Sequence, residues 1–246
     1  MFRWFTKWSD RSATGMHKIR LDFSEMLEAA RLAFTLATDT CLAGVDTETV
    51  REKLLATDKE INQAERDIRK ALVLHMSVEN TLGGAADFPE CLVMMSIVKD
   101  AERLGDYAKN IFDLAVVSPL QAEAGDDRER MLVLKKIIDQ LFTSCRQVID
   151  KSDADAALKR IRESTWISRQ CEQNVVRLLR MENPGRLNAY YVLLYRYMKR
   201  IASHLRNICS SVVQPVHKID FTSKFTRGMD KDGDLLDRKL DVLSED

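Results

Sequence analysis

Apolar residues recur every three or four positions over most of the chain, and the pattern breaks where glycine or proline occurs. This spacing places the apolar side chains on one face of an α-helix. Asp46, Asp87 and Asp126 are typical helix-starting residues, and Gly44 is a typical helix end. The pattern predicts an all-α protein with six long helices, at about 16–43, 46–82, 87–118, 126–149, 153–181 and 186–214.

The third and sixth predicted helices carry the same apolar stripe. Every stripe residue of the sixth helix lies 97 positions after a stripe residue of the third, as Ile201 follows Leu104. Polar positions agree at the same offset, since Arg103 is matched by Arg200 and Asn110 by Asn207. An internal duplication of a three-helix unit follows, with the two copies related by a pseudo-twofold repeat.

The duplication predicts two tandem three-helix bundles, although one fused six-helix rod satisfies the same stripes. Offsets of 107 and 110 align the second helix with the fifth equally well. The expected organisation is a basic aromatic segment (1–15), a first repeat (16–118), a second repeat (119–215) and a polar acidic tail (216–246).

Composition narrows the function classes. The 246 residues include 38 basic and 38 acidic ones, which argues against attraction of the whole molecule to nucleic acid. The longest nearly apolar run, 91–98, is far shorter than the roughly 20 residues of a membrane-spanning helix. Five widely spaced cysteines indicate reduced thiols rather than a disulfide framework, so we expect a cytoplasmic protein.

The third predicted helix carries a charged face opposite its apolar stripe. Glu102 and Asp106 lie four residues apart there, one helical turn from each other. A solvated polar face is the simpler interpretation. A hard-cation site is the sharper one, and it requires oxygen ligands from a second helix. The second helix offers three candidates on one face, Asp58, Asn62 and Glu65.

These residues resemble a known family. The run Asp100-Ala-Glu-Arg-Leu-Gly-Asp-Tyr-Ala-Lys-Asn-Ile111 resembles the signature of PhoU proteins, and Asp58-Lys-Glu-Ile-Asn62 resembles the earlier element of that family, with Asn where Asp is usual. The resemblance covers about residues 17–215. It implies a cytoplasmic regulator of inorganic phosphate uptake and phosphate-starvation signalling, which binds components of a phosphate transporter and a sensor kinase.

The resemblance also implies a metal site. Some PhoU proteins hold iron or divalent metal clusters on the acidic motifs, and here Glu102, Asp106 and Asp58 would be the ligands of the first repeat, beside the motif positions Arg103 and Asn110. The second repeat departs from the pattern, because Lys199 and Ser203 occupy the places of the two carboxylates and Arg196 and Arg206 add positive charge. We expect one metal cluster at most, in the first repeat, and none in the second. Lys199 could supply the positive charge that a metal would bring, and the cationic replacement face also suits an anion or a protein contact, or is simply solvated.

The N-terminal segment is a second unusual feature. Trp4, Phe5 and Trp8 share one face if the segment is helical, and the first 20 residues contain five bases and one acid. Such a face suits a membrane surface or a partner groove, and a short helix folded on the bundle fits equally.

We find no enzymatic constellation and expect a non-catalytic protein. Three rivals stay open: an accessory subunit of a low-affinity or sodium-coupled phosphate permease, a metal-dependent phosphate-ester hydrolase, and a plain dimeric helical adaptor without a metal. The sequence also leaves open whether the chain forms a homodimer.

Overall fold

The computed structural model describes residues 15–82, 88–117, 125–182, 185–222 and 225. These residues form six long helices, one short 3-10 helix and no strand, so the all-α prediction is confirmed. The elements are α1 (Gly15–Ala43), α2 (Thr47–Leu82), α3 (Phe88–Val117), α4 (Asp126–Lys151), α5 (Ala154–Leu179), α6 (Arg186–Val213) and η2 (Val216–Lys218).

Helix starts follow local capping chemistry. Asp46 Oδ2 accepts a hydrogen bond from the Thr49 N–H at 2.9 Å, and so caps α2 as predicted. Helix α4 begins at Asp126, as predicted, and the residue before it, Gly125, is the N-cap, where its carbonyl accepts from the Arg128 N–H at 3.0 Å. Asp87 lies outside the described residues.

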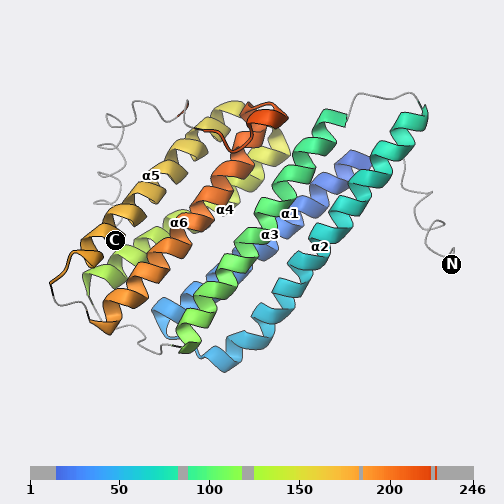
Figure 1. Cartoon of the computed structure of the whole chain (residues 1–246). Coiled ribbons are helices and arrows are strands. Elements are labelled where there is room, and N and C mark those ends of the chain that lie inside the picture. Colours follow the sequence, from blue (N-terminus) through green and yellow to red (C-terminus); the bar gives the residue numbers. More distant parts are fainter. Residues whose placement is uncertain (1–14, 83–87, 118–124, 183–184, 223–224, 226–246) are drawn as a thin grey trace.

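The helices pack as two groups of three. Helices α1, α2 and α3 contact one another, as do α4, α5 and α6. Figure 1 shows α3 and α6 side by side in the middle of the view, flanked by α2 and α5, with α1 and α4 behind them. Two seams join the groups, α3 against α6 and α1 against α4.

The stripes detected in the sequence form the core. Leu104 and Ile201, the central members of the two stripes, are both fully buried in equivalent helices. All five cysteines are free and buried, and they pack as small apolar side chains. Burial raises the pKa of the Cys41 thiol to about 11, which keeps this thiol protonated and unreactive at neutral pH.

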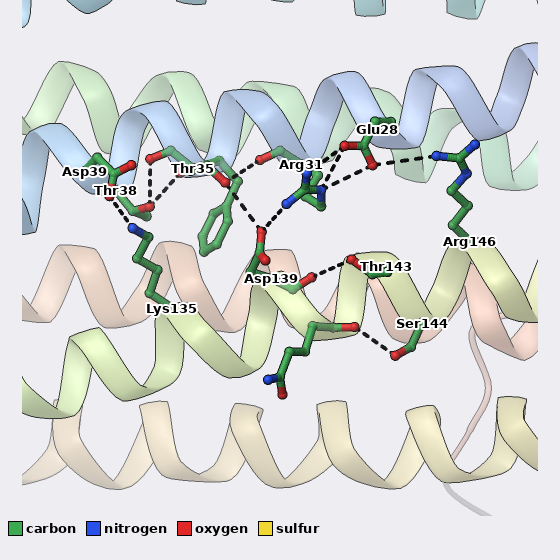
Figure 2. Close-up of polar contacts among 12 residues, drawn as sticks. Glu28, Arg31, Thr35, Thr38, Asp39, Lys135, Asp139, Thr143, Ser144 and Arg146 are labelled. Carbon is green, nitrogen blue, oxygen red and sulfur yellow. Dashed lines mark hydrogen bonds and ion pairs between the residues drawn. The ribbon is translucent and has the colours of Figure 1, made fainter. Parts of the chain in front are cut away.

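A polar seam joins α1 to α4 (Figure 2). Arg31 bridges the helices, with Nη2 2.7 Å from Glu28 Oε1 and Nη1 2.8 Å from Asp139 Oδ1. These two hydrogen bonds raise the pKa of Arg31 above its ordinary value, and the Arg31 partner lowers the pKa of Glu28. Lys135 forms an ion pair with Asp39 further along the seam. The two groups of helices are therefore joined here by charged side chains.

Candidate functional site

The acidic motif lies where α3 packs against α2. Glu102 is only 9% exposed, so its predicted place on a solvated face opposite the stripe is wrong. The reason is tertiary, because α2 covers this side of α3 and brings Glu65 to the same level. Lys99 Nζ lies 2.8 Å from Glu102 Oε2 and 3.6 Å from Glu65 Oε1, and thus joins the two buried carboxylates.

The other motif carboxylates also have cationic partners. Asp106 Oδ2 accepts a hydrogen bond from Arg103 Nη1 at 2.8 Å. Nearby charge from Glu102 contributes most to raising the pKa of Arg103. Asp58 Oδ1 lies 3.4 Å from Lys109 Nζ. The structure therefore places Asp58, Glu102 and Asp106 along one α2–α3 surface, each beside a lysine or arginine.

This arrangement does not fit a metal cluster as it stands. In the described part of the chain, no group of three or more Asp, Glu, His or Cys side chains gathers around a point that could hold a metal ion. Carboxylates that bind a hard cation must also be free of competing ammonium groups, whereas Lys99 contacts Glu102 directly. Asn62, at the position where an acid is usual, donates a hydrogen bond to Asp58 Oδ2 at 3.3 Å.

The equivalent surface of the second repeat is basic. Lys199, at the position of Glu102, forms an ion pair with Glu172 on α5, with 2.8 Å between Nζ and Oε2. The hydrogen bond from Lys199 lowers the pKa of Glu172. Arg196 is exposed, but Arg206 is half-buried, and burial lowers its pKa. The predicted cationic face thus consists of Arg196 and Lys199, with Arg206 turned partly inward.

A polar cluster at the α3–α6 seam was missed by the sequence analysis. Asp100, which is 8% exposed, accepts from His204 Nδ1 at 2.7 Å and from Asn207 Nδ2 at 3.1 Å, all through Oδ1. The carboxylate only accepts hydrogen bonds, so His204 is the donor here, through Nδ1–H. Asn207 is the counterpart of Asn110 at the offset of 97, and this equivalence was the one sign in the sequence that Asn207 occupies a motif position. Only the antiparallel pairing of α3 and α6 brings Asp100 to His204.

Several predicted contact residues cannot be placed. Trp4, Phe5 and Trp8 lie outside the described residues, and so does the acidic stretch after Phe225. Among the described helices, none is both long and apolar enough to cross a membrane.

The fold and the site define an all-helical protein of two tandem three-helix repeats. The third helix of each repeat carries a charged face. Residues 23–115, within the first repeat, match the PhoU domain family. The resemblance to the PhoU family is therefore confirmed, and the first repeat contains the matching domain.

Two curated relatives are also PhoU homologues. A phosphate-specific transport system accessory protein PhoU homolog from Pseudomonas putida is 27% identical over 176 residues, which cover 69% of this chain and 67% of that protein. Its namesake from Pseudomonas aeruginosa is 24% identical over 205 residues, which cover 80% and 83% of the two chains.

Solved structures share the fold. The crystal structure of PhoU from Pseudomonas aeruginosa superposes with a TM-score of 0.66 at 19% identity, covering 82% of this chain and 96% of that one. The phosphate transport system regulatory protein PhoU from Streptococcus pneumoniae gives a TM-score of 0.70 at 18% identity, covering 82% and 95%.

Proposed function

We propose that this protein regulates inorganic phosphate uptake and phosphate-starvation signalling in the cytoplasm, by binding components of a phosphate transporter and a sensor kinase. The PhoU domain over residues 23–115 carries the proposal, together with relatives named as accessory proteins of phosphate-specific transport. In this role the protein acts by contact and not by catalysis.

Helix faces are the contact surfaces in this mechanism. The third helices of the two repeats lie side by side and differ in charge. On α3, Glu102 and Asp106 are paired with bases of the same helix, whereas α6 has Lys199 and Ser203 at the corresponding positions. The basic face of α6 can therefore engage an acidic partner surface. The N-terminal aromatic segment supplies a further contact, with the transporter or the membrane beside it.

Cells that lack the gene test the regulatory role. With phosphate plentiful, deletion should raise the initial rate of labelled phosphate uptake and the expression of a starvation reporter, and the full chain should restore both. A variant without residues 1–8 should restore neither if that segment is the transporter contact. Unchanged uptake and reporter levels in the deletion strain would contradict the proposal.

Vesicle binding identifies the partner. The purified chain should co-sediment with vesicles that bear the ATP-driven transporter, and not with vesicles that bear a low-affinity or sodium-coupled permease. The reverse result supports the accessory-subunit alternative. Size-exclusion chromatography with light scattering then reports whether a homodimer forms.

Metal binding at Glu102, Asp106 and Asp58 stays a prediction. The first repeat has all three carboxylates, but each forms an ion pair with a lysine or arginine side chain, which a metal would have to displace. A phosphate-ester hydrolase would need such a metal. Release of phosphate from a simple aryl phosphate, with manganese present, would favour this rival over the regulatory role.

A further inference from the structure

Helix α6 carries five basic residues and no acidic residue. Four side chains form its outward row, which we call the α6 ridge: Leu193, Arg196, Arg200 and Ser203. The spacing of these positions places them on one side of the helix, and Leu193 is 43% exposed there. The ridge is thus a basic surface that contains an exposed apolar residue.

Comparison of the repeats shows what the ridge lacks. Both repeats have a base at two equivalent positions of this face, since Arg196 corresponds to Lys99 and Arg200 to Arg103. The first copy neutralises these bases, with Lys99 on Glu102 and Arg103 on Asp106, each at 2.8 Å. The second copy has a base at both of these positions and neither acid.

No described residue replaces the lost acids. Glu172 is the acid nearest to this face, and Lys199 already holds it at 2.8 Å, with Arg196 adding only a smaller lowering of the pKa of Glu172. Within the described residues, neither Arg196 nor Arg200 forms an ion pair or a hydrogen bond. The adjoining part of α5 adds two more exposed apolar side chains, Val176 at 40% and Leu179 at 68%.

The chain itself contains a segment of complementary chemistry. Residues 230–246 include seven acids and three bases. The stretch 234–243 contains three of these acids and two of the bases, Arg238 and Lys239. With helical spacing, Asp234, Asp237 and Asp241 share one side, which Arg238 borders, and Leu236, Leu240 and Leu243 share another side. An acidic row beside a leucine row matches a basic row beside exposed apolar residues.

The connection is long enough. After α6 the chain turns back over the end of that helix, where Gln214 Nε2 donates to the Phe221 carbonyl at 3.0 Å and Phe225 packs against the core. From there to Asp234 the chain can span up to about 30 Å, since an extended residue covers about 3.3 Å. Arg200 lies about 20 Å from the end of α6, at 1.5 Å per residue.

We propose that residues 234–243 dock on the α6 ridge, with their acidic row on Arg196 and Arg200 and their leucines over Leu193 and the α5 apolar residues. The segment then supplies in cis the negative charge that the second repeat has lost. An acidic partner that binds this face must then displace the docked segment.

Hydrogen exchange of the full chain tests the contact. The amides of residues 236–243 should exchange about tenfold more slowly than in a free peptide of the same sequence. Arg196→Glu/Arg200→Glu should abolish that protection. Lys53→Glu/Lys59→Glu, which makes the same charge change at two exposed lysines of α2, should leave it unchanged.

A charge swap separates docking from misfolding. Asp237→Arg/Asp241→Arg alone should also lose protection, and the quadruple variant that combines both charge reversals should regain it. Free-peptide exchange rates in the wild type would overturn the proposal, as would protection that survives Arg196→Glu/Arg200→Glu. Protection that grows with protein concentration would also overturn it, because the contact would then join two molecules.

Discussion

Tyr107 stacks on His204 across the boundary between the two repeats, with ring centroids 5.6 Å apart and ring planes 28° apart. The two residues are 97 positions apart, so they are equivalent positions of the two repeats. Tyr197, whose counterpart is Asp100, also contacts Tyr107, with a centroid distance of 6.3 Å. The pseudo-twofold axis therefore passes close to this ring pair.

Asp100 is expected to hold the repeats together at this axis. Asp100→Ala leaves the donors of His204 and Asn207 without their buried acceptor, and we expect a loss of about 2 kcal/mol in the free energy of unfolding. Urea denaturation followed by circular dichroism measures the loss. Asp113→Ala, on an exposed position of the same helix, should cost less than about 0.5 kcal/mol. Equal effects of the two variants would contradict the role of Asp100.

Gly105 of α3 packs against Ile61 of α2. A Cβ atom at this position would lie 2.9 Å from Ile61 Cδ1, the far end of a flexible side chain. Overpacking costs about 1–3 kcal/mol and the greater helix propensity of Ala offsets about 1 kcal/mol of it, so Gly105→Ala should destabilise the protein by at most about 2 kcal/mol. Ile61→Val removes the Cδ1 atom and should recover part of that loss in the double variant. Gly125→Ala is the control for an added Cβ that meets no atom within 4 Å, and it should cost only the preference of an N-cap for Gly over Ala, under about 1 kcal/mol.

The α1–α4 seam should weaken in acid. The hydrogen bond from Arg31 lowers the pKa of Glu28 below its ordinary 4.5, so the folded state favours the ionised form. This stabilisation is present above pH 4.5 and is lost as the pH falls through the lowered pKa. Glu28→Gln should therefore cost about 0.2–1 kcal/mol at neutral pH, the range of exposed ion pairs, and nothing once the carboxyl is protonated.

Urea denaturation at pH 7 and in acid measures this dependence. The difference between wild type and Glu28→Gln should vanish at the acid end. Glu25→Gln, an exposed glutamate of α1 without an ion pair to a described residue, should show no such pH dependence. A Glu28→Gln difference that persists unchanged in acid would show that packing, not charge, is responsible.

Lys99 should compete with any metal at the acidic motif. Its ammonium lies 2.8 Å from Glu102 Oε2, so a cation has to displace it. We expect Lys99→Met to bind manganese about tenfold more tightly than the wild type in calorimetric titration. Adding Glu102→Gln and Asp106→Asn to this variant should remove the binding. Lys59→Met, which removes an exposed lysine of α2, serves as the control, and equal affinity in both lysine variants would contradict competition by Lys99.

The sequence alone was sufficient for the elements and for the duplication. Helical periodicity is a local property, so the stripes through Leu104 and Ile201 predicted both the helices and the faces that they bury. A repeat offset is likewise visible without coordinates. The resemblance to the PhoU family rested on a short motif, whose residues lie next to each other in the chain.

Only the tertiary structure decided what surrounds the motif. Glu102 looked solvated because helical spacing describes one helix, whereas its burial depends on where α2 packs. The pairing of Asp100 with His204 joins residues 104 positions apart, and it arises from the antiparallel contact of α3 with α6. Which charged side chains pair between helices depends on the distances between them. These distances follow from helix packing and cannot be obtained from the order of charges in the sequence.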